Sequence, residues 1–182
     1  MEFYKLKNRL IVGDYIIKNL QTSYDLNEGG EFKGIKYYNL ELTTGHNLIW
    51  SLIPKQYHKG FYTSLMKINT QIPPHTDTSD KTVINIYVRP ENCVTDFYKF
   101  KSNTNNTKQI TNQTDGFLYD EKDLIINSNF LAKYNDVYVL DVTKPHSVKP
   151  QSKFEERVII QLGTSTYVFN DVCDMLRETG NL

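Results

Sequence analysis

Apolar and polar residues alternate with a period of two along much of the chain, which is the pattern of half-buried β-strands. The clearest case is KTVINIYV (81–88), where Val83, Asn85 and Tyr87 alternate with aliphatic residues. In a strand, these two sets of side chains project to opposite faces of the sheet. Further alternating or apolar runs predict strands at 34–44, 47–53, 60–72, 95–101, 136–142 and 157–164.

Only the C-terminal region has a helical period. Apolar residues three or four positions apart form one stripe there: Phe169, Val172, Cys173 and Leu176. Gly180 follows this stripe and is typical of the end of a helix. The spacing therefore predicts one C-terminal amphipathic helix.

A polar segment interrupts the predicted strands. Residues 102–115, SNTNNTKQITNQTD, are rich in Asn and Thr and predict an exposed loop. Together with 116–134, we expect this loop to border the mouth of a substrate site.

The predicted elements indicate one mainly β domain over residues 1–182, with few helices. No internal repeat or linker divides the chain, and 182 residues suffice for one hydrophobic core. Many short strands are typical of a sandwich or barrel, and a cupin-type jelly roll (a double-stranded β-helix) is the expected fold.

Composition narrows the range of partners. Lys+Arg and Asp+Glu both number 21, so the net charge gives no reason to expect a long nucleic acid as partner. No apolar run approaches the roughly 18 residues of a membrane span.

Cys93 and Cys173 form no CxxC motif, which argues against a disulfide framework or a cysteine-based zinc site. Because the N-terminus also carries no pattern of a secretion signal, we expect a cytoplasmic protein.

Candidate metal ligands lie in PPHTDTSD (73–80). His75 and Asp77 are two residues apart, so in a strand both side chains project to one face. His-x-Asp also arises by chance in turns, and a third ligand is needed to decide. His146, which follows the predicted strand 136–142, can supply it. Two histidines and one carboxylate form the facial triad of non-haem Fe(II) sites, which leaves coordination positions open.

Arg157 opens the apolar run RVIIQLGT (157–164), eleven residues after His146. A buried, unpaired cation is strongly disfavoured, so an arginine in a core strand indicates an anionic partner. Guanidinium groups bind carboxylates in a bidentate manner. The alternative is a surface arginine that follows the charged stretch KFEE.

The order His75-x-Asp77, then His146, then Arg157 resembles the Fe(II)- and 2-oxoglutarate-dependent oxygenases over about residues 60–163. The runs INTQIPPHTD and INIYV are most similar to the aspartyl/asparaginyl hydroxylase-like branch and to small viral or bacterial members. The resemblance implies that His75, Asp77 and His146 bind Fe(II) and that Arg157 holds the distal carboxylate of 2-oxoglutarate. With O2, such a site hydroxylates a C–H bond of a protein or peptide side chain, an amino acid or a small metabolite.

The chain departs from this family at one position. Some branches have a serine two residues after the arginine that also binds the cosubstrate, whereas here Ile159 occupies that place. Its hydroxyl partner must then come from neighbouring strands, and the candidates are Ser64 and Tyr87. Asn85, on the same face as Tyr87, is a candidate to bond either the cosubstrate or the substrate. Gln161 is a further candidate, because it lies on the same strand face as the arginine.

The remaining histidines, His46 and His58, lie in turn-like surroundings and are interpreted as surface residues. Asp141 either orients a neighbouring group or is solvated. Two alternatives to an oxygenase stay open: a cupin-like zinc or manganese protein, acting as an isomerase or hydrolase without 2-oxoglutarate, and a non-catalytic binding module.

Overall fold

The structure is a computed structural model of the chain, and it describes residues 1–11, 35–39, 46–90, 92–101, 107–110, 116–151 and 156–182. The strands in this part of the chain are β1 (Phe3–Lys5), β2 (Ile35–Asn39), β3 (Tyr62–Ile68), β4 (Ile72–Asp77), β5 (Thr82–Arg89), β6 (Cys93–Phe100), β7 (Thr107–Ile110), β8 (Gly116–Tyr119), β9 (Leu124–Leu131), β10 (Val137–Asp141), β11 (His146–Pro150) and β12 (Arg157–Thr164). The helices are α2 (His46–Trp50), α3 (Phe169–Glu178) and the 3-10 helices η1 (Lys55–Gly60) and η2 (Glu121–Asp123).

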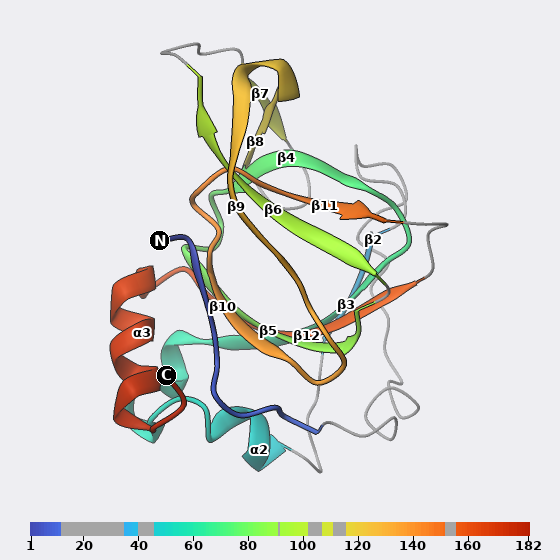
Figure 1. Ribbon diagram of the computed structural model, residues 1–182. Coiled ribbons are helices and arrows are strands. Elements are labelled where there is room, and N and C mark those ends of the chain that lie inside the picture. The colour runs from blue at the N-terminus through green and yellow to red at the C-terminus, as the bar shows by residue number, and fades with distance from the viewer. Residues whose placement is uncertain (12–34, 40–45, 91, 102–106, 111–115, 152–155) are drawn as a thin grey trace.

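The strands form two antiparallel six-stranded sheets (Figure 1). Sheet 1 has the order β1-β10-β5-β12-β3-β2, and sheet 2 has the order β7-β8-β4-β11-β6-β9. Consecutive strands alternate between the two sheets from β3 to β6 and again from β9 to β12. This winding is that of a double-stranded β-helix, so the predicted cupin-type jelly roll is confirmed.

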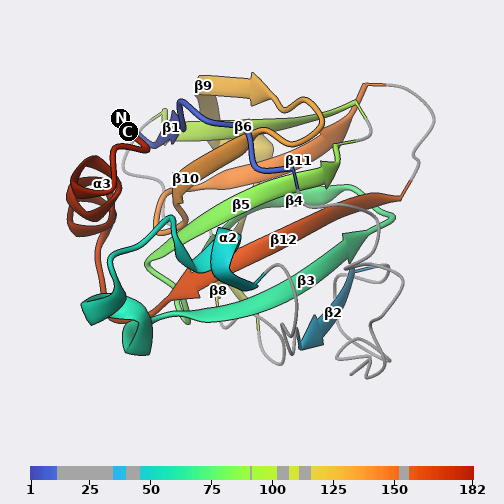
Figure 2. The ribbon, with the colours of Figure 1, turned by 90° about the horizontal axis from the view of Figure 1, so that it is seen from below.

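The alternation predicted for 81–88 is confirmed, and it separates two hydrophobic cores. Val83 and Tyr87 pack between the sheets, with side chains of β6 and β11. Ile84 and Ile86 pack on the other face of sheet 1, against α3 and the segment 49–53. Seen from below, α2 crosses in front of sheet 1 (Figure 2). Sheet 1 is therefore covered on both faces, and its inner face is available to form a site.

The C-terminal helix is confirmed as α3. The four predicted apolar residues are buried, and Gly180 has a positive φ of 76° just beyond the helix end. Its missing side chain makes this left-handed conformation inexpensive. None of the helices in the described ranges is long and apolar enough to cross a membrane.

The predicted strand at 47–53 is wrong, because His46–Trp50 forms the helix α2. Ile49, Leu52 and Ile53 are buried together in the core outside sheet 1. A spacing of three and four residues suits a helical turn, but a short apolar run looks the same in a buried strand. The turn-like surroundings predicted for His46 are corrected as well, since His46 begins this helix.

The predicted strand at 60–72 is two strands. β3 ends at Ile68 and β4 begins at Ile72, and the chain passes from sheet 1 to sheet 2 between them. The polar residues 69–71 mark this break. The predicted strand at 34–44 is confirmed for Ile35–Asn39 as β2, and its remaining residues lie outside the described part.

The segment 102–115, predicted as a loop, contains the strand β7, which pairs with β8. A polar strand at a sheet edge lacks the apolar alternation that sequence patterns detect. The other residues of this segment lie outside the described ranges.

Candidate metal centre

The two prolines before His75 form an irregularity in β4. Ile72 pairs with Val148 and His75 pairs with His146, so two residues of β4 oppose a single residue of β11 between these pairs. This is a β-bulge, and prolines suit it because they have no N–H to donate to the ladder. In a regular strand Ile72 and His75 would face opposite sides. The extra residue turns both toward the space between the sheets.

The turn between β10 and β11 places His146. The Asp141 carboxylate accepts hydrogen bonds from the backbone N–H and the hydroxyl of Thr143, at 3.2 and 2.5 Å. The backbone N–H of Asp77 donates to the carbonyl of Val142, at 3.0 Å. Asp141 thus holds the turn whose next residues deliver His146 opposite β4.

Both histidines have their tautomer set by the backbone. The Nδ1 of His75 lies 2.9 Å from the carbonyl oxygen of Pro73, and the Nδ1 of His146 lies 2.9 Å from that of Lys144. A carbonyl can only accept, so each Nδ1 carries the proton and each Nε2 carries the lone pair. Such backbone contacts orient metal-binding histidines in proteins.

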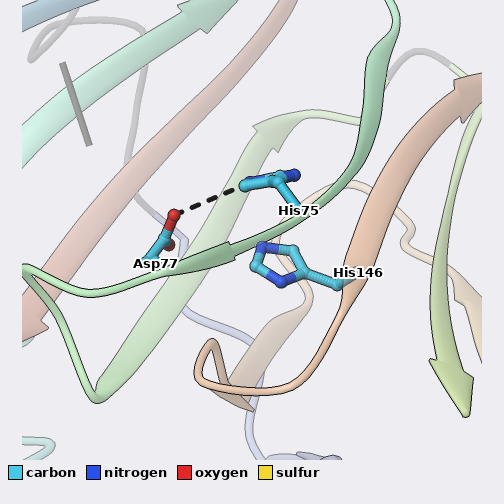
Figure 3. A group of neighbouring side chains, drawn as sticks. All are labelled: His75, Asp77 and His146. Carbon is cyan, nitrogen blue, oxygen red and sulfur yellow. Dashed lines mark ion pairs between the residues drawn. The ribbon is translucent and has the colours of Figure 1, made fainter. Parts of the chain in front are cut away.

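The three predicted ligands converge (Figure 3). One ligand atom from each of His75, Asp77 and His146 lies within 4.8 Å of the others. The two imidazole centroids are 4.2 Å apart, and the Nε2 of His75 is 3.7 Å from the Oδ1 of Asp77. These separations exceed a hydrogen bond and allow one ion to contact all three residues.

Burial keeps both imidazoles neutral. It lowers the pKa of His75 to about 4, although the hydrogen bond to Pro73 acts in the opposite direction. Burial, followed by the proximity of His75, lowers the pKa of His146 to about 3. Neutral imidazole is the form that binds a metal, so the site needs no deprotonation of these rings at neutral pH.

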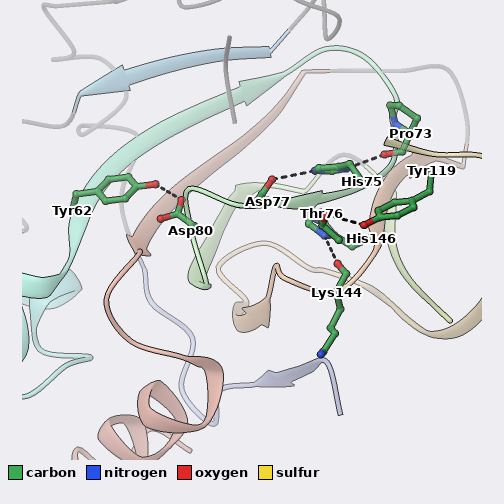
Figure 4. A network of polar contacts seen from close by, with 9 residues as sticks. All are labelled: Tyr62, Pro73, His75, Thr76, Asp77, Asp80, Tyr119, Lys144 and His146. Atoms are coloured by element: carbon green, nitrogen blue, oxygen red, sulfur yellow. Dashed lines mark hydrogen bonds and ion pairs between the residues drawn. The ribbon is translucent and has the colours of Figure 1, made fainter. Parts of the chain in front are cut away.

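Asp77 lacks a counter-charge among the described residues. Burial is the main cause that raises its pKa, to about 8, and repulsion from Asp80 adds to it. Asp80 is itself buried, has a raised pKa and accepts a hydrogen bond from Tyr62 (Figure 4). The Oδ1 of Asp77 is buried and accepts no hydrogen bond from the described part of the chain. A bound cation would neutralise the buried carboxylate and so offset the free-energy cost of its burial. The donor set therefore fits a divalent metal.

The ligands line a cavity between the sheets, of about 600 Å³ including its mouth. Its walls are mostly aliphatic side chains from both sheets, namely Ile35, Met66, Ile68, Ile72, Val83, Leu140, Val142, Val148 and Ile159. A mostly aliphatic lining with a few polar groups is the character of small-ligand sites.

Arg157 lines the same cavity and is 1% exposed. Its Nη2 donates to the hydroxyl of Thr95, at 3.2 Å, and its Cζ lies 4.7 Å from the centroid of the Tyr87 ring. Its Nε and Nη1 are buried and have no acceptor among the residues that the structure describes. This buried guanidinium therefore has donors to spare for an anion.

Thr95 is the hydroxyl that contacts Arg157, and the sequence analysis did not single it out. Thr95 lies on β6 of the opposite sheet, and the alternation of Cys93, Thr95 and Phe97 toward the core was the available signal. Tyr87, one of the predicted partners, contacts the guanidinium of Arg157 with the face of its ring.

The other predicted polar residues sit side by side on sheet 1. Asn85 and Gln161 line the cavity, whereas Ser64 is buried beside them and donates to the Oε1 of Gln161, at 3.3 Å. His58 is half-buried rather than fully at the surface. Its Nε2 lies within 3.0 Å of two backbone carbonyls, so it stabilises the turn before η1. The side chain of His46 lies outside the described part.

No protein-family model matches the chain, and no curated protein sequence matches it. Among solved structures it is similar to HygX from Streptomyces hygroscopicus, crystallised with nickel, 2-oxoglutarate and hygromycin B. The TM-score is 0.50 at 10% identity, over 92% of this chain and 84% of that one. A cupin-like protein from Thermotoga maritima gives a TM-score of 0.36 at 13% identity, over 72% and 69%. Oxalate decarboxylase from Bacillus subtilis gives 0.38 at 14%, over 76% and 27%. At these identities the likeness is one of fold.

Proposed function

We propose that this protein is an Fe(II)- and 2-oxoglutarate-dependent oxygenase that hydroxylates a C–H bond of an amino acid, a protein side chain or a small metabolite. The observation that carries the proposal is Arg157. A buried guanidinium with unpaired donors lines the same cavity as a two-histidine, one-carboxylate cluster. A metal site alone gives no reason for this second, cationic group.

His75, Asp77 and His146 would hold the iron, each through one atom. Bound there, Fe(II) with 2-oxoglutarate and O2 supplies the oxidising power for C–H hydroxylation. The protein residues keep the imidazoles neutral, orient them through Pro73 and Lys144, and provide one negative charge from Asp77. Three protein ligands leave open positions for the cosubstrate and oxygen.

Arg157 would bind the distal carboxylate of 2-oxoglutarate. Tyr87 and Thr95 hold its guanidinium from two sides, so little side-chain freedom is lost on binding. The aliphatic walls exclude water, which strengthens the ion pair and protects the reaction from side reactions. The likeness of fold to HygX, crystallised with nickel and 2-oxoglutarate, is consistent with this use of the cavity.

The test is anaerobic addition of Fe(II) and 2-oxoglutarate to the metal-free protein. We expect a weak visible charge-transfer band that requires both, since the keto acid must chelate the metal. Glutarate, the same five-carbon diacid without the keto group, is the matched control and should give no band. Metal binding without any band would favour a cupin-like metal protein that does not use 2-oxoglutarate. Failure to bind metal would favour a non-catalytic module.

A further inference from the structure

The cavity contains a polar atom that 2-oxoglutarate cannot satisfy. Asn85 is 6% exposed and lines the cavity, and its Oδ1 accepts no hydrogen bond from the described residues. An amide oxygen only accepts, and an ionised dicarboxylate also only accepts. On the proposed function, a bound metal would contact the unpaired oxygen of Asp77, and the cosubstrate would pair with Arg157. The oxygen of Asn85 is free to accept a hydrogen bond from a ligand that donates one.

Gln161 supplies the complementary donor beside it. Asn85 on β5 and Gln161 on β12 are register partners, and Ser64 on β3 is the partner of Gln161 on its other side. The hydroxyl of Ser64 donates to the Oε1 of Gln161, so this amide offers its Nε2 hydrogens. Side chains directly opposite on neighbouring strands are about 5 Å apart, close enough for one small planar group to contact both.

We propose that Asn85 and Gln161 recognise the substrate, and that the group they bind is an N–H beside a C=O on one edge. The inference rests on the proposed function for what fills the rest of the cavity. A primary carboxamide and a lactam both present this edge. A trans peptide unit does not, because its N–H and C=O point in opposite directions. A carboxylate has no hydrogen for Asn85.

The position along β12 separates this pair from the cosubstrate. Gln161 lies four residues beyond Arg157, which at about 3.3 Å per residue is about 13 Å of strand. The five-carbon diacid spans four C–C bonds of about 1.5 Å, or at most about 6 Å. A cosubstrate held by Arg157 therefore leaves room for a second ligand farther along the strand, beside Gln161.

The experiment uses the full chain loaded with zinc, which is redox-inert, and 2-oxoglutarate. Ligand-observed NMR titration compares propionamide and uracil with N,N-dimethylpropionamide, 1,3-dimethyluracil and propionate. We expect propionamide or uracil to bind. The probe with the higher affinity shows whether the substrate carries a carboxamide or a lactam. The methylated compounds and the carboxylate should not bind. If neither propionamide nor uracil binds, the inference is wrong.

Variants assign the contact. Gln161→Met removes the donor and keeps a side chain of similar length. It should lower the affinity for the probe by about fivefold to 100-fold and leave the affinity for 2-oxoglutarate unchanged. Gln161→Glu, which replaces the donor with an acceptor, is the second variant should the first not fold. Gln151→Met, at an exposed glutamine, is the matched control. Lost 2-oxoglutarate affinity with unchanged probe binding would place Gln161 at the cosubstrate and overturn the inference. Failure of the proposed function would look different: probe binding would persist without a charge-transfer band.

Discussion

Replacing Asp77 with asparagine should stabilise the metal-free protein while it abolishes metal binding. Burial raises the pKa of this carboxyl from 3.8 to about 8. The folded state therefore holds the proton to a higher pH than the unfolded state, and ionisation opposes folding. Stability is unaffected below about pH 4 and is lost as the pH rises from about 4 to 8. At about 1.4 kcal/mol per unit, the loss is about 3 kcal/mol at pH 6.

Asparagine has nearly the same shape and no charge. Metal-free Asp77→Asn should match the wild type near pH 4 and exceed it by about 3 kcal/mol at pH 6, which is roughly 6–12 °C in Tm for a domain of this size. Burial lowers the pKa of His75 and His146, so both proteins also lose stability as the pH falls from about 6.5 toward 4. That loss is common to both proteins and cancels in the difference.

The assay is thermal unfolding followed by circular dichroism across pH 4–8, first with a chelator and then with Zn(II) or anaerobic Fe(II). Metal should raise the Tm of the wild type, because an ion that binds only the folded state stabilises it. It should leave Asp77→Asn unchanged. Asp120→Asn, at an exposed carboxyl next to Lys122, is the control and should stay within about 0.5 kcal/mol of wild type. A metal-free Asp77→Asn protein that is less stable than wild type at pH 6 would refute the reasoning.

Three further outcomes are expected. Arg157→Ala should lower the affinity for 2-oxoglutarate about tenfold to 150-fold in titrations of the iron-loaded protein, and Arg157→Lys should recover only part of this affinity. An unchanged affinity in Arg157→Ala would remove Arg157 from the site. Gly116→Ala would place a Cβ 1.9 Å from the backbone oxygen of Thr76, so it should disrupt the β4–β8 pairing beside Asp77 and lower both Tm and metal affinity; calorimetry showing normal metal affinity would contradict this. Leu176→Ala, on the buried face of α3, should lower the free energy of unfolding by about 2–5 kcal/mol in denaturant titrations, with the cosubstrate affinity unchanged in the folded protein.

The sequence alone determined which way side chains point within a strand. The alternation over 81–88 assigned Asn85 and Tyr87 to one face, and both line the cavity. Arg157, at the first position of an apolar strand, was predicted to be buried and is. These features are local, since the period of two is a property of each extended strand by itself.

Tertiary structure decided which strands meet, and several features of the site depend on that. The bulge at Pro73 and Pro74 exists only relative to β11, yet it turns His75 toward His146. Thr95 reaches Arg157 from the opposite sheet, 62 residues away in sequence. The unpaired oxygen of Asn85 becomes visible only once its neighbours are in place. The period of two predicts which face of a strand a residue occupies. The partners of that residue come from strands remote in sequence, which the burial of both cores brings together. This pairing leaves no local pattern in the chain.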